Sequence, residues 1–505
     1  MVETRLLSLP KPQKSRCSVE ELENFEVFGK SRNGYAVWRE QALKGFILRE
    51  GEDLPERALQ VIWQQQRLKS DLKLGDGRRL RVLHPGFWNY EAGPDFRDAV
   101  VRIGDKPPIR GDVEVDVELS GWRAHGHDTN PSFSNVVLRV VWKLPRHNCD
   151  GIFALQPHLD SPWPKLKEWA LNEPVGDLPA RLRGTCCEPL RSMSESQRGE
   201  LLDQAALVRL QLKASQLDAR ARQVGWDQAL LEGLFAGLGY KRNAWPMRQV
   251  ARAMNELKLK RADSGNETVR LALLLGIAGL MPDDWSRSDQ RRSQYLAELW
   301  SAWWRLREAA RDHSLPLEMW RFSGVRPSNR PERRLALAAQ WLHATDLPKR
   351  IEDWCGNNVP TRQATGQLHE ILGQKSPSFF DDHCTFSAKP LARKAPLIGA
   401  ARLTDLAVNT VLPWLHARAR AGRNRKLISR IENLYLTWPK SEDNSLLRLA
   451  RQRLLGARSV RALKTAGHQQ GLIQIVRDFC AHTDSLCTGC PFPDYVKRLD
   501  FGRAD

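Results

Sequence analysis

The stretch Gly111-Asp112-Val113-Glu114-Val115-Asp116-Val117-Glu118 alternates valine with acidic residues, and this alternation decides the fold class of its region. Successive side chains of a β-strand point to opposite faces of a sheet. We therefore expect a strand over 113–119 whose valines enter a core, while three carboxylates line the other face. Such a face either holds a divalent cation, which takes oxygen ligands, or is exposed to solvent, as one face of many antiparallel sheets is.

The residues around this strand extend the acidic face into a candidate active site. Asp95 precedes the strand in Gly93-Pro94-Asp95-Phe96, and two histidines follow it in Trp122-x-x-His125-Gly126-His127. We expect Asp95 and Glu114 to hold Mg²⁺ or Mn²⁺, with Asp116 as a third ligand or as a residue that positions water. His125 and His127 would serve as general acid, phosphate contact or metal ligand.

Two other interpretations of the same residues stay open. Glu114, His125 and His127 are also a ligand set for zinc, which predicts a zinc-dependent hydrolase. Alternatively, the acidic strand is merely exposed, and the chain is a non-catalytic protein that binds nucleic acid or takes part in an assembly. Cleavage that depends on Mg²⁺ or Mn²⁺, tight zinc binding, and salt-sensitive binding without turnover distinguish the three interpretations.

The apolar patterns along the chain predict an α+β protein, with a small mixed α/β domain followed by a larger all-α domain. An amphipathic pattern over 54–68 predicts a helix, and helical spacing dominates again from a capping box at Ser194 and Gln197 onward. Prolines between these regions predict a linker. Strands are expected at 79–83, 98–103, 136–142 and 152–155, and the expected organisation is a leader (1–48), an α/β domain (49–165), a linker (166–185) and a helical domain (186–505).

The composition points to a polyanionic partner. Lysine and arginine number 78 against 59 acids among 505 residues, so the net charge is +19. A charge of this sign favours nucleic acid through electrostatic steering and counterion release, and the densest basic segment lies at 418–430. The sequence has no run of 18 apolar residues that would predict a membrane helix. Nine cysteines without a secretory signal predict a reducing, cytoplasmic setting.

Three cysteines lie close together near the C-terminus, in a spacing typical of metal ligands. Cys480, Cys487 and Cys490 end in Cys-Thr-Gly-Cys-Pro, and a C-x2-C pair directs two thiolates at one metal from a tight turn. A fourth ligand is expected, and the candidates are Cys186, Cys187 and His482. By spacing alone, the group suits zinc or an iron–sulfur cluster.

Taken together, these segments resemble a bacterial family without an assigned activity, domain-of-unknown-function family 2851, from about Leu54 onward. Asp116 and Arg139 stand where this family usually has histidine, so an activity that depends on those histidines would be altered here. The matching segments are Pro85-Gly86, Gly93-Pro94-Asp95-Phe96, Gly111-Asp112-Val113-Glu114-Val115, Trp122-x-x-His125-Gly126-His127, Gly239-Tyr240-Lys241-x-Asn243, Arg326-Pro327-x-Asn329-x-Pro331-Glu332-Arg333-Arg334, Asp405-x-x-x-Asn409-x-x-Leu412-Pro413 and Gln470-Gly471-Leu472-Ile473-Gln474.

The α/β region also resembles the PD-(D/E)xK nuclease superfamily, which implies a restriction-endonuclease-like fold and a Mg²⁺- or Mn²⁺-dependent nuclease. In that superfamily a helix precedes a three-stranded meander, and Asp95 and Glu114 fill the two acidic positions. Asp116 stands at the position of the usual lysine, and Gln65 or Gln66 would be the helper on the helix. Some of these nucleases carry four cysteines with one distant in sequence, which implies a metal or cluster site made of Cys187, Cys480, Cys487 and Cys490.

Overall fold

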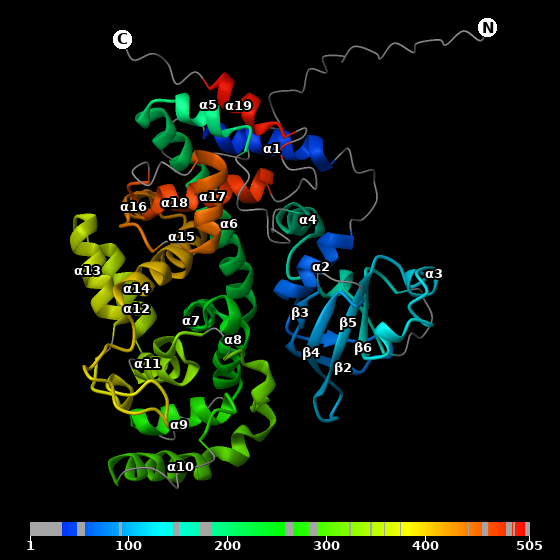
Figure 1. Cartoon of the computed structure of the whole chain (residues 1–505), viewed down its shortest axis with the longest axis vertical. Coiled ribbons are helices and arrows are strands. Elements are labelled where there is room, and N and C mark those ends of the chain that lie inside the picture. The colour runs from blue at the N-terminus through cyan, green and yellow to red at the C-terminus, as the bar shows by residue number, and fades with distance from the viewer. Residues whose placement is uncertain are drawn as a thin grey trace.

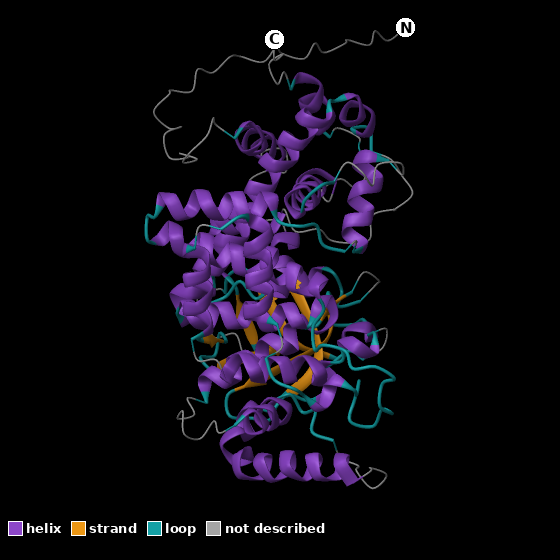
Figure 2. Cartoon of the chain, turned by 90° about the vertical axis from the view of Figure 1, so that its left-hand side faces the viewer, coloured by secondary structure: helices purple, strands orange, loops and turns teal. Residues whose placement is uncertain are grey.

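The chain consists of a sheet region and a larger helical body, as the sequence predicts (Figure 1). Strands gather in one place, and helices make up the remainder (Figure 2). No helix among the described residues is long and apolar enough to cross a membrane. The computed structural model describes residues 33–47, 56–89, 93–144, 151–171, 184–257, 266–282, 290–322, 325–343, 346–357, 359–373, 375–442, 444–456, 463–480, 487 and 490–499.

Seven strands form one mixed sheet in the described part of the chain. The strand order is β1-β2-β4-β5-β6-β7, with β3 paired to β4 off this path. Strands β2, β4 and β5 are antiparallel neighbours, whereas β6 runs parallel to β5 and β7 parallel to β6. The bounds are β1 (Leu72–Lys73), β2 (Arg79–His84), β3 (Phe87–Trp88), β4 (Phe96–Ile103), β5 (Ile109–Asp116), β6 (Val136–Val141) and β7 (Ile152–Ala154).

The acidic strand is buried on both faces, and this is the main departure from its predicted form. Strand β5 begins at Ile109 and ends at Asp116, so Glu118 lies beyond it and is exposed. Val113 and Val115 enter the core as expected, but Glu114 and Asp116 are only 7% and 2% exposed. The interpretation of a solvated acidic face is therefore wrong for these two carboxylates.

Helices α2 (Glu56–Gln65) and α4 (Trp163–Leu171) pack against each other and share the core of the sheet region. Trp63 of α2 is fully buried, and its indole Nε1 donates to the carbonyl of Pro85 at 2.9 Å. Leu166 of α4 is in the same core. The first part of the predicted linker is therefore a packed helix, since proline is well tolerated in the first turn of a helix. Residues 172–183 lie outside the described part.

The long helix α6 of the helical body begins with the expected capping box. Ser194 Oγ accepts from the Gln197 backbone, and Gln197 Oε1 accepts from that of Ser194, at 3.2 and 3.0 Å. The helices are α5 (Cys187–Ser192), α6 (Glu195–Val224), α7 (Trp226–Leu238), α8 (Tyr240–Glu256), α9 (Glu267–Ile277), α10 (Gln290–Ala310), α11 (Pro331–His343), α12 (Leu347–Gly356), α13 (Thr361–Leu372), α14 (Ala400–Leu406), α15 (Leu412–Ala421), α16 (Arg425–Thr437), α17 (Ser445–Leu455), α18 (Ala466–Ile475) and α19 (Phe492–Arg498), with π-helical turns η8 (Ala407–Val411) and η10 (Val476–Cys480).

Helix α1 (Gly34–Ile47) belongs to the helical body, although the sequence places it in a leader. It lies beside α5 and α19, which are distant from it in the sequence (Figure 1). The Tyr35 hydroxyl donates to Asp478 Oδ2 at 2.7 Å, and the Trp38 ring stacks on Tyr495 at 3.9 Å. The predicted leader boundary is therefore wrong for this helix, and residues 1–32 lie outside the described part.

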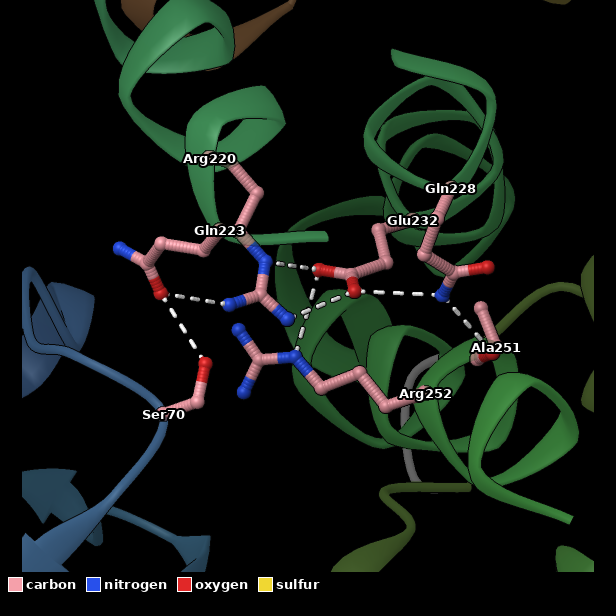
Figure 3. A network of polar contacts seen from close by, with 7 residues as sticks. All are labelled: Ser70, Arg220, Gln223, Gln228, Glu232, Ala251 and Arg252. Atoms are coloured by element: carbon pink, nitrogen blue, oxygen red, sulfur yellow. Dashed lines mark hydrogen bonds and ion pairs between the residues drawn. The ribbon is translucent and has the colours of Figure 1, made fainter. Parts of the chain in front are cut away.

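A polar network joins the sheet region to the helical body (Figure 3). Glu232 of α7 accepts from Arg220 of α6 at 2.8 and 2.9 Å and from Arg252 of α8 at 3.3 Å. Arg220 also donates to Gln223 Oε1 at 3.0 Å, and the same oxygen accepts from the Ser70 hydroxyl at 3.2 Å. Because Ser70 lies in the loop before β1, these contacts tie the sheet region to α6.

Candidate active site

Asp95 and Glu114 lie side by side where β4 and β5 begin to pair. The backbone N–H of Asp95 donates to Glu114 Oε2 at 3.0 Å. In return, Asp95 Oδ2 accepts from the backbone N–H of Val115 at 3.1 Å. The structure therefore brings together the two acids that the sequence assigns to a metal, and it fixes both carboxylates through the backbone of the neighbouring strand.

Helix α2 supplies two further residues, Glu56 and Gln60. Gln60 Nε2 donates to Asp95 Oδ1 at 2.9 Å. The exposed Glu56, one turn earlier, interacts electrostatically with Asp95, Glu114 and Asp116. The helper role expected for Gln65 or Gln66 is wrong, because these side chains donate to Gln64 Oε1 and to the Trp63 carbonyl. The spacing of Glu56 and Gln60, four residues apart on one helix face, is the signal that would have identified them.

The carboxylates of this site are difficult to ionise together. Burial and neighbouring carboxylates raise the pKa of Asp95 to about 7 and that of Glu114 to about 8. Burial also raises the pKa of Asp116, and the nearby His127, Arg139 and His125 oppose that effect. In neutral solution these acids therefore need either bound protons or a cation to compensate their charge.

Both predicted histidines reach the acidic site, from the turn that follows α3 (Gly121–Ala124). His127 Nδ1 lies 3.4 Å from Glu114 Oε1, and His125 Nδ1 lies 3.8 Å from Asp116 Oδ1. His127 stacks on Phe133 at 3.9 Å, which orients its ring, whereas the side chain of His125 is 56% exposed.

Asp116, His125 and His127 can place their ligand atoms around one point. One such atom from each residue lies within 4.8 Å of the other two. Asp116 Oδ2 and His127 Nδ1 are buried and have no hydrogen-bond partner. Gly121 leaves room for the acid, since a Cβ there would be 2.7 Å from Asp116 Oδ1. Unpartnered carboxylate oxygen and imidazole nitrogen suit a metal ion, because both are common metal ligands.

Arg139 places a positive charge beside Asp116. It lies opposite Glu114 in the parallel pairing of β5 with β6, and it lowers the pKa of Asp116. Its Nη2 donates to the Leu119 carbonyl at 3.0 Å, and its guanidinium lies 4.6 Å from the centre of the Trp122 ring. Asp116 and Arg139, which stand where histidines are expected, therefore interact electrostatically as an acid and a base.

A family model described as "Protein of unknown function (DUF2851)" matches residues 56–445. The chain belongs to this family. No curated protein and no solved structure matches the chain. The segment matched by the DUF2851 model contains every acidic and histidine residue of the candidate active site, so this site is part of the region that defines the family.

The predicted cysteine ligands Cys187 and Cys480 belong to α5 and η10 of the helical body, and α5 lies far from β5 (Figure 1). Cys480 ends η10, and the Cys490 backbone N–H donates to the Cys487 carbonyl at 3.3 Å. Burial raises the pKa of Cys186, and the three C-terminal cysteines raise it further. Of the two adjacent candidates for a fourth ligand, Cys186 thus interacts with the C-terminal cysteines, and Cys187 is the buried first residue of α5. His482 lies outside the described residues.

Proposed function

We propose that the site around Asp95 and Glu114 is the metal-dependent active site of a phosphodiesterase that acts on nucleic acid. The observation that carries this proposal is the burial of Glu114 and Asp116, with one oxygen of Asp116 left without a hydrogen-bond partner. A strand that only faces solvent has no reason to bury two acids, because desolvating a charge without compensation is costly.

The order of elements also supports a nuclease-like site. Helix α2 precedes the antiparallel strands β2, β4 and β5, and α3 then leads into the parallel strand β6. This is the helix and meander that the resemblance to PD-(D/E)xK nucleases implies. Asp95 lies just before the middle strand β4, Glu114 lies in β5, and α2 contributes Gln60.

In this proposal, Asp95 and Glu114 hold Mg²⁺ or Mn²⁺, and Glu56 and Asp116 contribute negative charge around it. A bound divalent ion would polarise the phosphate and lower the pKa of an attacking water. Gln60 holds the Asp95 carboxylate in place through Oδ1. His127, fixed by its stack on Phe133, lies close enough to Glu114 to exchange a proton with a group bound there. Asp116 stands at the position where the superfamily has lysine, and Arg139 compensates the charge of Asp116.

A second candidate is a zinc-dependent hydrolase, and one specific observation favours it. The ligand atoms of Asp116, His125 and His127 meet within 4.8 Å, whereas the zinc set expected from the sequence has Glu114 in the place of Asp116. Zinc binding there would depend on both histidines. Isothermal titration with Zn²⁺ and with Mn²⁺ separates the two functions, because His127→Gln should remove zinc binding and leave most of the binding of a hard cation to Asp95 and Glu114.

The stabilisation by Mn²⁺ should increase with pH and level off above about pH 8. Asp95 and Glu114 titrate near 7 and 8 without metal, so at lower pH the ion must displace protons from them. These raised pKa values also mean that the stability of the metal-free protein falls as the pH rises from about 4 to about 8. Thermal melts with and without Mn²⁺ across this range test both statements. A shift by Mn²⁺ that does not change with pH would contradict the assignment of these two ligands.

A nucleic-acid partner is proposed from charge, and the basic segment 418–430 contributes only in part. Arg418 pairs with Glu352, and Arg430 donates to the carbonyls of Cys355 and Asn357 at the end of α12. These two arginines therefore hold α12 against α15 and α16. Arg420, Arg423 and Lys426 are exposed where α15 turns into α16, and they are available for phosphate contacts.

Replacing Arg420, Arg423 and Lys426 together by alanine should weaken DNA or RNA binding and flatten its salt dependence. Each lost phosphate contact lowers the slope of log K against log salt by about 0.7 to 0.9. Fluorescence anisotropy titrations at several salt concentrations measure this slope. The matched control replaces Lys389, Arg393 and Lys394, which are exposed elsewhere and remove the same charge. Equal effects of the two triple variants would show that net charge alone, and not this surface, sets the affinity.

A further inference from the structure

Three parts of the chain that are far apart in sequence bring four cysteines to one place. Cys186 lies just before α5, Cys480 ends η10, and Cys487 and Cys490 follow within a tight turn. Cys186 and Cys480 are buried in the core that α1, α5, α6, α17 and α18 share, and Cys490 packs against this core. Cys186 interacts electrostatically with the other three cysteines, and α5 and α19 lie at the same end of the helical body (Figure 1).

A turn at Gly184 brings two of the sulfurs next to each other. The Gly184 backbone N–H donates to the Arg453 carbonyl at 2.9 Å, and the Gly184 carbonyl accepts from the Cys187 backbone at 3.0 Å. A Cβ added to Gly184 would lie 3.2 Å from Cys186 Sγ and 3.7 Å from Cys487 Sγ. Both sulfurs therefore lie close to the same point, although Cys487 follows Cys186 by 301 positions in the sequence.

A buried arginine accompanies the cysteines. The side chain of Arg453 is among the largest that are fully buried, and its Nη2 donates to Cys487 Sγ at 3.4 Å. A buried cation that donates to sulfur stabilises the thiolate form, which is the form that binds metals. Arg453 also hydrogen-bonds to Cys480 and opposes the rise in the pKa of that thiol that burial causes.

No three of these sulfurs lie as close together as the ligands of a single zinc ion do. With a Zn–S distance of about 2.3 Å, tetrahedral ligands lie about 3.8 Å apart. Among the described residues, the group of three or more ligand atoms that meets within 4.8 Å is that of Asp116, His125 and His127, and the sulfurs form no such group. We propose that Cys186, Cys480, Cys487 and Cys490 ligate an iron–sulfur cluster, which is larger than one ion and takes four cysteine ligands.

The cluster would cross-link two segments of the helical body that are distant in the sequence. It joins the start of α5 to the segment between η10 and α19, so the chain from 186 to 480 becomes one closed loop. Cross-links between distant residues restrict the unfolded chain most strongly, and metal binding adds its own free energy to folding. This proposal is independent of the acidic site, since it rests on different residues in a different part of the molecule.

The test uses the full-length chain, purified without oxygen. We expect iron and acid-labile sulfide in equal amounts, about two or about four of each per chain, with a visible absorption band that oxidation bleaches. Cys186→Ser, Cys487→Ser and Cys490→Ser should each lose most of the iron. Cys187→Ser, the neighbouring cysteine, and Cys355→Ala, a buried cysteine of α12, should keep it.

The wild-type protein provides a measurement that does not depend on whether the variants fold. Removing the iron with a chelator after oxidation should lower the melting temperature, and reconstitution with iron and sulfide should restore it. Stoichiometric zinc without iron would overturn the cluster proposal, and so would a purified and reconstituted protein that holds no metal. Retention of iron by Cys186→Ser would overturn the assignment of Cys186 as the fourth ligand.

Discussion

Asp95→Asn and Glu114→Gln are each expected to abolish Mn²⁺-dependent cleavage of nucleic acid while the protein stays folded. Both changes remove a charged ligand and keep the shape of the side chain. The loss should reach about a thousandfold, because a bound metal contributes several kcal/mol of transition-state stabilisation. A nicking assay with Mn²⁺ measures this loss directly.

The fold should survive Asp95→Asn because its hydrogen bonds can be re-formed. The asparagine oxygen can still accept from the Val115 N–H. Gln60 can rotate its amide so that its oxygen, instead of its nitrogen, faces the new Nδ2. Removal of one carboxylate also relieves repulsion within the site, so the metal-free variant should be at least as stable as the wild type.

Thermal melts provide the second readout and the control. Mn²⁺ at a hundredfold excess over its dissociation constant should stabilise the wild type by about 2.7 kcal/mol and neither variant. Glu118→Gln is the matched control, because Glu118 is an exposed acid just beyond β5 whose carboxylate accepts from Ser120. It should leave both activity and the Mn²⁺ shift unchanged. If Mn²⁺ shifts wild type, Asp95→Asn and Glu114→Gln equally, the proposed ligands are wrong.

Arg39→Ala should destabilise the protein by about 3–5 kcal/mol, the cost of leaving a buried charge without its partner. Arg39 Nε lies 2.9 Å from Asp478 Oδ1, and the Asp478 side chain is fully buried. Tyr35 and Gln474 also donate to this carboxylate, at 2.7 and 2.8 Å, but neither carries a positive charge. Urea denaturation measures the change in the free energy of unfolding.

Two controls separate this effect from a general loss of arginine. Arg78→Ala removes the partner of Asp76 from a pair in which Arg78 is 46% exposed, so its cost should stay below about 1 kcal/mol. Arg39→Ala combined with Asp478→Asn should recover part of the loss, because the buried charge disappears with its partner. An Arg39→Ala variant as stable as the wild type would mean that α1 is not held in the helical body.

The local pattern of residues was enough to predict most of the strands and the start of α6, and it singled out Asp95, Glu114 and Asp116 but not Glu56. Alternation of Val113 and Val115 with Glu114 defines a strand whatever surrounds it, because side-chain direction has a period of two along any strand. The helix at α2 follows from its apolar spacing in the same way. The pairing of Asp95 with Glu114 could be expected because a short connection joins antiparallel neighbours.

Tertiary structure alone decided what each of these residues faces. Burial of Asp116 depends on the segments that return to it, including Gly121 and His127, and the strand pattern does not reveal whether a polar face is covered. The contact of α1 with Asp478 spans 443 residues. The position of Cys186 close to Cys487 likewise depends on the turn at Gly184, whose backbone N–H donates to the Arg453 carbonyl of α17. Sequence periodicity determines the direction of a side chain relative to its own backbone. The partners of that side chain are set by packing between segments that are distant in the chain. The pKa values and the ligand geometry of both proposed sites depend on those partners.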